Sequence, residues 1–154
     1  MNLTIQSGGQ TGADRAALDW AIVKGVPHRG WCPLGRQAED GTLPEKYLLE
    51  ETTSTNYAVR TKRNIQDSDG TVIISIELNL DGGSHLTQRL AQEMKKPVLH
   101  LHGQTTAPGI QLRNFIEKHR LQILNIAGPR ASREPNIYNV VVGILDSAFS
   151  KEPD

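Results

Sequence analysis

The apolar residues of this chain fall into two kinds of pattern that alternate along the sequence. Short runs rich in Ile, Leu and Val predict β-strands at Leu3–Ser7, Thr71–Ile76, Val98–His102 and Leu121–Ala127. Apolar residues three or four positions apart predict helices at Ala13–Lys24, Tyr57–Gln66, Pro108–Lys118 and Ile137–Ala148, and another helix through Leu86, Leu90, Ala91 and Met94.

Residues at the ends of these helices suggest where each begins and stops. Gly25 is expected to end the first helix, and Asn56 is expected to cap the second. Ser84 is expected to cap the helix that follows it, and Thr105 or Thr106 the helix near Pro108. In that last helix we expect three side chains to point inward, namely Ile110, Phe115 and Ile116.

The segment from residue 28 to 56 shows neither the apolar runs of a strand nor the apolar spacing of a helix. It is interrupted by Pro33, Gly35, Gly41 and Pro44. We expect a long ordered loop with one short helix near Glu45–Glu51, because loops of this length in compact domains are usually functional or disordered and the Trp and Cys content here favours order.

Strands that alternate with helices indicate a parallel sheet covered by helices on both faces. The sequence therefore predicts an α/β fold, a three-layer sandwich with a mostly parallel sheet. A length of 154 residues fits one domain, which we place at residues 1–150, followed by a tail at 151–154.

Composition and charge exclude several classes of protein. Seventeen basic residues balance seventeen acidic ones, which argues against a disordered charged tail and against an electrostatic nucleic-acid binder. The chain has no apolar run long enough to span a membrane and no signal-peptide pattern at its start. The single cysteine, Cys32, excludes a disulfide framework and a Cys-rich zinc site. We expect a cytoplasmic protein without a membrane or nucleic-acid partner.

Three loops share one design, in which a strand leads through a glycine turn into the start of a helix. They are Gly8–Gly12, Gly82–Ser84 and Gly128–Ser132. In a parallel sheet these loops all lie at the carboxyl edge, where open α/β sheets bind ligands. Helix starts offer unpaired amides and partial positive charge, so we expect the loops to meet at one rim and to leave amides free for an anion.

Side chains near this rim supply the remaining candidates for a ligand site. Arginines suit the recognition of phosphate or oxyanions, and Trp31 and Cys32 are expected to line the flat part of a ligand. The predicted ligand-binding residues are Gly8, Gly9, Gln10, Thr11, Gly12, Trp31, Cys32, Arg36, Arg60, Gly82, Gly83, Ser84, Arg130 and Ser132.

Carboxylates are the candidates for acid–base chemistry, should the protein be an enzyme. These are Asp14, Glu39 and Asp40. The pair Glu39 and Asp40 could bind donors of a ligand or simply pair with Arg36. The glycine loops have neither the dinucleotide spacing nor a P-loop Lys, so NAD is not expected. His100 and His102 alternate on one strand and could form a metal site with His85, but nothing else supplies a fixed third ligand, so no structural metal is expected either.

The motifs together resemble the family of putative molybdenum carrier proteins. They are SGGQTGADR at Ser7–Arg15, GWCPLGR at Gly30–Arg36 with AEDG at Ala38–Gly41, Tyr57 with Arg60 and Thr61, DSDGT at Asp67–Thr71, Gly82–Ser84, and GPRAS at Gly128–Ser132. The resemblance covers about residues 3–146 and implies a Rossmann-like fold, binding of molybdenum cofactor (a pterin that carries a phosphate and a molybdenum dithiolene) and homo-oligomers.

A wider resemblance extends to the lysine-decarboxylase-like phosphoribohydrolases, which cleave nucleoside monophosphates. Arg60 lies where their arginine would, and Gly82 and Gly83 match the start of their glycine loop. The following residues, Ser84–Arg89, have neither the second glycine nor the catalytic Glu of that pattern. The sequence therefore favours a carrier that binds a phosphate-bearing heterocycle without catalysis, with a nucleotide or N-glycoside hydrolase as the alternative.

Overall fold

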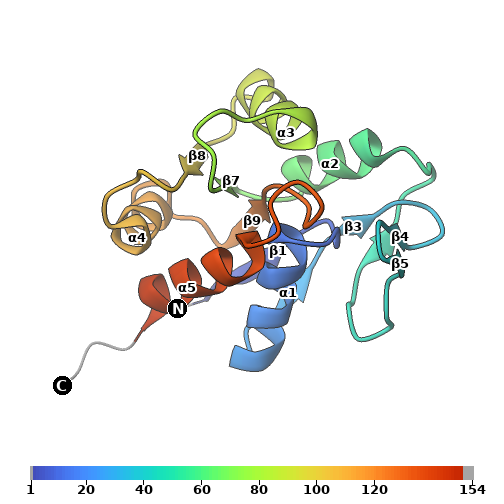
Figure 1. The fold of residues 1–154 in the computed structure, drawn as a ribbon, viewed down its shortest axis with the longest axis horizontal. Coiled ribbons are helices and arrows are strands. Elements are labelled where there is room, and N and C mark those ends of the chain that lie inside the picture. Colours follow the sequence, from blue (N-terminus) through green and yellow to red (C-terminus); the bar gives the residue numbers. More distant parts are fainter. Residues whose placement is uncertain (1, 151–154) are drawn as a thin grey trace.

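A five-stranded parallel sheet forms the centre of the molecule in the computed structural model, which describes residues 2–150 (Figure 1). The strand order is β2-β1-β9-β7-β8, and every neighbouring pair is parallel. The strands are β1 (Thr4–Gln6), β2 (His28–Arg29), β7 (Gly70–Ile74), β8 (Val98–Leu101) and β9 (Ile123–Ala127). The predicted tail at 151–154 lies outside the described residues.

Helices cover both faces of this sheet. The helices are α1 (Ala13–Lys24), α2 (Tyr57–Gln66), α3 (Gly82–Glu93), α4 (Pro108–His119) and α5 (Ile137–Phe149). Helix α5 packs between α1 and α4 on one face, and α2 packs beside α3 on the other (Figure 1). The predicted α/β sandwich is confirmed. No helix within residues 2–150 is long and apolar enough to cross a membrane.

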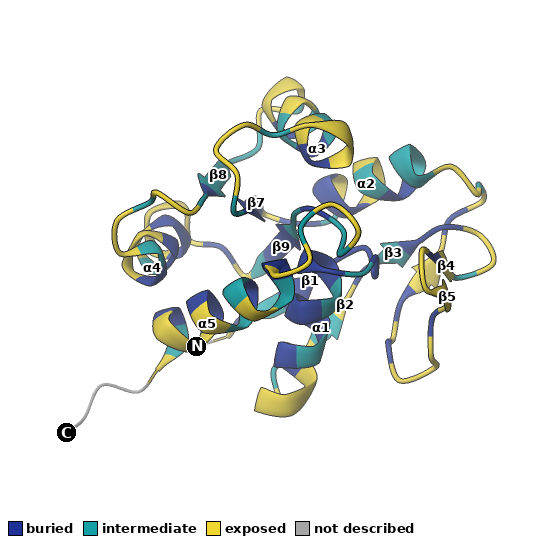
Figure 2. Ribbon diagram, in the orientation of Figure 1, coloured by how far each residue is buried: buried dark blue, intermediate teal, exposed yellow. Residues whose placement is uncertain are grey.

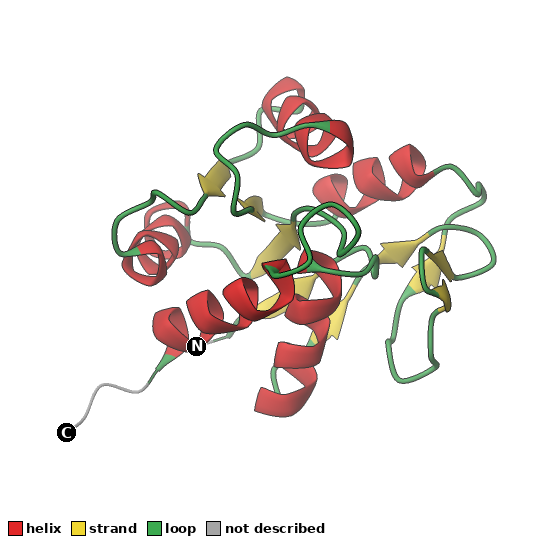
Figure 3. Ribbon diagram, in the orientation of Figure 1, coloured by secondary structure: helices red, strands yellow, loops and turns green. Residues whose placement is uncertain are grey.

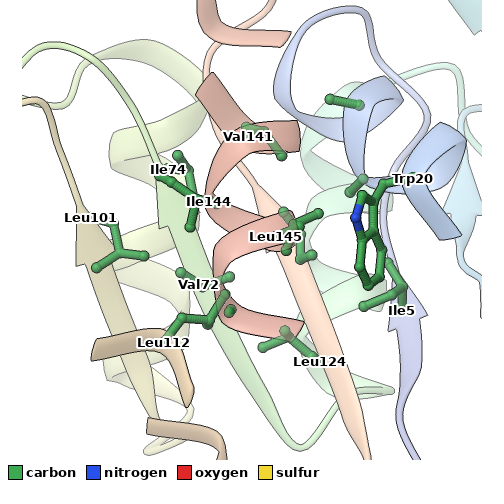
Figure 4. Close-up of a cluster of buried hydrophobic side chains, with 14 of the residues drawn as sticks. Ile5, Trp20, Val72, Ile74, Leu101, Leu112, Leu124, Val141, Ile144 and Leu145 are labelled. Carbon is green, nitrogen blue, oxygen red and sulfur yellow. The ribbon is translucent and has the colours of Figure 1, made fainter. Parts of the chain in front are cut away.

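The main core lies between the sheet and the layer of α1, α4 and α5 (Figure 4). Ile5, Val72 and Leu124 project from the strands, and Leu112 and Leu145 meet them from the helices, all five without exposed surface. Burying a side chain of this size contributes about 1.5–3 kcal/mol. This packing holds the carboxyl ends of the central strands at fixed relative positions.

Helix ends follow the predicted signals in part. Gly25 ends α1 with a positive φ of 68°, and the Asn56 side chain accepts a hydrogen bond from the Ala58 amide, as expected. Other predictions are wrong: Asp81 occupies the N-cap position of α3 in place of Ser84, and Ala107 that of α4 in place of a threonine.

Thr105 does not cap α4, because its side chain is hydrogen-bonded in the turn that precedes this helix. Its Oγ1 accepts a hydrogen bond from the His102 amide at 2.9 Å, which closes the turn after β8. Ile110 was expected to point inward, but 63% of its surface is exposed. Leu112 takes the buried position, together with Phe115 and Ile116 as predicted.

The short helix expected near Glu45–Glu51 does not form. Instead the segment turns and ends in β6 (Glu50–Glu51), which pairs in parallel with β3 (Trp31–Cys32), as Figure 3 shows beside the central sheet. The Arg36 guanidinium instead holds the turns of this region together, because it donates hydrogen bonds to four main-chain carbonyls. These carbonyls belong to Leu43, Pro44, Tyr47 and Leu49.

A second, smaller core keeps residues 30–52 ordered. It consists of Leu18, Cys32, Ala38, Leu43, Tyr47 and Leu49. An exposed hairpin of β4 (Gln37–Ala38) and β5 (Gly41–Thr42) projects from it, and its tip carries Glu39 and Asp40 (Figure 2). The small core thus places two carboxylates at a fixed position near the start of α1.

Candidate anion-binding cleft

The loops after β1, β7 and β9 lie at the same edge of the sheet because these three strands are parallel and β9 lies between the other two. A cleft opens there between the β1 loop, α2, the start of α3 and the β9 loop. It encloses about 610 Å³, part of which is open to solvent. The predicted meeting of the glycine loops at one rim is therefore what the structure shows.

Arg60 lies deep in this cleft, although it belongs to α2 on one face of the sheet. Only 9% of its surface is exposed, and its Nη1 donates to the Gly8 carbonyl at 2.9 Å and approaches Asp14 Oδ2 at 3.5 Å. A Cβ on Gly8 would lie 2.5 Å from that Nη1, so the guanidinium can reach the β1 loop only because residue 8 is glycine.

Asp14 forms the acidic wall of the cleft next to Arg60. Burial raises the pKa of this carboxyl above its ordinary value, and the opposing attraction of the Arg60 guanidinium does not cancel that effect. Asp14 Oδ2 also accepts a hydrogen bond from the Gln10 amide at 3.2 Å. A buried carboxyl with a raised pKa is a group that could hold a proton near the ligand.

Two further arginines come from the loop after β9. The Arg130 guanidinium lies over the Tyr57 ring at 5.9 Å from its centroid, and Arg60 lies 5.2 Å from the same ring. Arg133 Nη1 pairs with Asp81 Oδ1 at 2.8 Å. The cleft therefore has three guanidiniums against the carboxylates of Asp14 and Asp81, which favours an anionic ligand.

The start of α3 contributes polar groups that the protein does not use itself. The amides of Gly83 and Ser84 make no hydrogen bond to any of the described residues. Ser84 is 7% exposed, and its hydroxyl also has no hydrogen-bond partner among residues 2–150. A Cβ on Gly83 would meet open space. Free amides at a helix start, with the positive end of its dipole, form a binding surface for phosphate or carboxylate.

In the loops after β1 and β9, in contrast, several amides are already bound by the protein's own groups. The Thr11 amide donates to Gln10 Oε1, and the Ala131 amide donates to Thr11 Oγ1 at 3.1 Å. Ser132 donates to Glu39 from its amide at 3.1 Å and from its hydroxyl at 2.6 Å. The expectation of free amides therefore fails for these groups and holds for the start of α3.

Glu39 and Asp40 reach these loops from the β4–β5 hairpin and do not pair with Arg36. Asp40 forms an ion pair with Arg15 at 2.9 Å, and Glu39 also accepts from the Thr11 hydroxyl. Partial burial would raise the pKa of Glu39, but the hydrogen bonds from Ser132 and Thr11 outweigh it and hold the pKa below its ordinary value. The two carboxylates clamp the β1 and β9 loops outside the cleft.

Three predicted ligand residues lie away from the cleft. The Trp31 indole donates to Asp67 at 2.6 Å and stacks under the Arg63 guanidinium. Cys32 is fully buried in the small core, and burial raises the pKa of its thiol. Arg36 is held by main-chain carbonyls, as described above.

The other predicted ligand residues divide into those that line the cleft and those that do not. Gly8, Gln10, Arg60, Gly83, Ser84 and Arg130 line the cleft. Gly9, Thr11, Gly12, Gly82 and Ser132 belong to the same loops without lining it. Gly12 sits where the β1 and β9 loops cross, because a Cβ there would lie 2.5 Å from the Pro129 carbonyl oxygen.

Two amide side chains that line the cleft, Asn64 and Asn125, were not predicted from the sequence. Asn125 pairs in register with Gln6 and Thr71 on the strands beside it, so a polar row crosses the sheet. Gln6 Nε2 donates to Asn64 Oδ1 at 3.0 Å, whereas Gln6 Oε1 is buried without a donor among the described residues. The sequence did contain a signal for Asn125, because a polar residue that interrupts an apolar strand needs a polar partner or a polar site.

The described residues contain no group of three His, Cys, Asp or Glu side chains placed to hold a metal ion. His100 Nε2 lies 2.6 Å from the Ser75 hydroxyl, and the tilted His100 and His102 rings have their centroids 5.2 Å apart.

Comparisons with known proteins agree with this arrangement. A crystal structure of a putative molybdenum carrier protein from Syntrophus aciditrophicus SB, at 1.45 Å resolution, is 45% identical in sequence, with a TM-score of 0.93. The match covers 96% of this chain and 94% of that one. A search of the curated proteins found no relative. The model of the circularly permutated YpsA SLOG family matches residues 5–149, and the chain belongs to that family.

Proposed function

We propose that this protein binds a small phosphorylated or oxyanionic ligand in the cleft and acts as its carrier, with molybdenum cofactor as the cargo. The observation that carries the proposal is that three guanidiniums line one cleft together with an α3 start whose first amides are unused. The name of the 45%-identical structural neighbour supports a molybdenum-related ligand.

The energies of the available contacts are sufficient for such binding. A helix start contributes about 0.3–1 kcal/mol, and each hydrogen bond to a charged group about 1.5–3 kcal/mol. Arg60, Arg130 and the Gly83 and Ser84 amides offer several such bonds, whereas a micromolar dissociation constant requires about 8 kcal/mol. A phosphate group fits this donor set, and the cofactor's metal would need no ligand from the protein.

The proposal includes two further expectations about the carrier. It is expected to act in the cytoplasm and to form a homo-oligomer, as the resemblance to molybdenum carriers implies. Native mass spectrometry of protein purified from a host that makes the cofactor measures both the mass of the assembly and the mass of any bound ligand. Protein that stays free of ligand, and that also fails to take up added cofactor, would contradict the carrier function.

The anion site is tested with inorganic phosphate as the probe. Isothermal titration calorimetry is expected to show binding that weakens about tenfold in Arg130→Ala, because one charged hydrogen bond of about 1.5 kcal/mol is lost. Arg29→Ala is the matched control, since Arg29 pairs with Asp67 outside the cleft. Equal affinities for phosphate in wild type and Arg130→Ala would contradict the assignment.

A second candidate function, hydrolysis of a nucleotide or N-glycosidic bond, is favoured by Asp14 alone. Its carboxyl lines the cleft with a raised pKa, which suits a group that donates a proton to a leaving base. Glu39 and Asp40 are engaged with the rim loops outside the cleft. Release of free base from a panel of nucleoside monophosphates, abolished in Asp14→Asn, would establish this activity in place of the carrier role.

A further inference from the structure

A second hollow adjoins the cleft on the side of the loop between β7 and α3. The two hollows share four lining residues, Asp81, Ser84, Pro129 and Arg133, so they adjoin along these side chains. The second hollow is otherwise lined by Glu77, Asn79, Leu80 and Glu134. A ligand held by its anion in the cleft could therefore extend into this second space.

The two hollows have opposite charge. The cleft has three guanidiniums, from Arg60, Arg130 and Arg133, against two carboxylates. The second hollow has the three carboxylates of Glu77, Asp81 and Glu134 against the single Arg133 guanidinium. A ligand that complements both must be anionic at one end and rich in N–H donors, or cationic, at the other.

Two of the three carboxylates in the second hollow are already engaged. Glu134 accepts hydrogen bonds from the Ile76 amide at 2.7 Å and the Glu77 amide at 3.3 Å, which fix the loop after β7. Asp81 is paired with Arg133. The Glu77 carboxylate has no hydrogen bond or ion pair with any described residue, so it is the acceptor that remains available to a ligand.

Ser84 lies where the two hollows adjoin. It lines both of them, only 7% of its surface is exposed, and its hydroxyl has no hydrogen-bond partner among the described residues. Gln6 Oε1, and not the Ser84 hydroxyl oxygen, is the fully buried side-chain atom without a partner among residues 2–150, so the Ser84 oxygen still reaches the space of the hollows. A ligand that crosses the junction between the hollows would supply the missing partner.

We propose that the ligand is bipartite: its phosphate lies in the cleft, and an amino or amidine-type group lies in the second hollow against the Glu77 carboxylate. The inference rests on the proposed anion site and adds to it the chemistry of the opposite end of the ligand. A bare inorganic oxyanion could bind in the cleft but would leave the second hollow unused.

The test compares two series of simple ligands that differ only at the far end. ω-Aminoalkyl phosphates with two to five carbons are titrated by calorimetry against alkyl phosphates that carry a methyl group in place of the amine. The same titrations are made with Glu77→Gln and with the control Glu45→Gln, an exposed glutamate that does not line either hollow. Thermal melting confirms that both variants are folded.

We expect the amine to improve affinity about tenfold at the chain length that spans the hollows, since a charged hydrogen bond contributes about 1.5 kcal/mol. Glu77→Gln should remove most of that preference, and Glu45→Gln should keep it. Equal binding of the two series to wild type, or a preference that survives in Glu77→Gln, would overturn the inference while the anion site stands. Binding of neither series would overturn the proposed function and the inference with it.

Discussion

Two groups of glycine loops meet at the edge of the sheet, and they differ in what their polar groups contact. The loops after β1 and β9 use several of theirs within the protein: the Ser132 amide and hydroxyl donate to Glu39, and the Gln10 amide donates to Asp14. The start of α3 leaves the Gly83 and Ser84 amides and the Ser84 hydroxyl without partners among residues 2–150.

The difference separates two uses of the same local design. The Glu39 carboxylate accepts hydrogen bonds from Thr11 and Ser132 as the carboxylate of a ligand would. These bonds hold the β1 and β9 loops together beside the cleft. The start of α3 has no such internal anion, although it has the same strand–glycine–helix pattern. A glycine turn therefore indicates where an anion can bind, and the tertiary partners decide whether the anion comes from the protein or from a ligand.

The largest expected effect distinguishes the two groups by stability. Gly12→Ala is expected to lower the free energy of unfolding by about 3 kcal/mol, because Gly12 has a φ of 79° and a Cβ would lie 2.5 Å from the Pro129 carbonyl oxygen. Gly83→Ala should change it by less than about 0.5 kcal/mol, since its Cβ meets open space. Urea denaturation measures both, and similar losses would remove the distinction.

A pair of serines provides an intermediate test. Ser132→Ala is expected to lower the free energy of unfolding by about 1 kcal/mol through the lost hydrogen bond to Glu39, with phosphate affinity unchanged. Ser84→Ala should leave stability nearly unchanged and weaken phosphate binding about fivefold. Denaturation and calorimetry on the same two variants give the comparison, which the reverse pattern would refute.

The smallest expected effect concerns acid stability. The folded-state pKa of Glu39 is held below its ordinary value of 4.5, so its contribution is complete above that pH and is lost as the pH falls through the lower folded-state value. Glu39→Gln should therefore show a shallower loss of stability below about pH 4.5, by less than about 1 kcal/mol because the group is exposed. Denaturation midpoints from pH 3 to 7 would show this, with Glu45→Gln as the control. Parallel pH profiles for wild type and Glu39→Gln would contradict it.

The sequence was sufficient to predict four of the five strands of the central sheet, the helices and the edge at which the loops meet, whereas β2 lies in the segment that was expected to be a loop. Ala13–Lys24 and Tyr57–Gln66 have the bounds that periodicity and end signals predicted. These features depend on local patterns and on the geometry of parallel strands, both of which can be read without knowing tertiary contacts.

The partners of individual polar residues could not be predicted in this way. Arg36 satisfies carbonyls of its own loop, Trp31 donates to Asp67, and Cys32 packs in a small core. Each is a residue type common in ligand sites, but its role depends on how residues 28–56 fold, and that segment has no period. Asn125 differs from these three residues, because its place in the cleft could have been inferred from the sequence. It is a single polar residue within an apolar strand, and it lines the cleft.

The central claim is that the start of α3, and not the β1 and β9 loops, receives the anion. The most direct measurement is a titration of ¹⁵N-labelled protein with inorganic phosphate, followed by the amide signals in NMR spectra. The account predicts that the Gly83 and Ser84 signals shift together on binding, while those of Gln10 and Ser132 stay in place. Shifts at Gln10 and Ser132 with none at Gly83 and Ser84 would contradict it.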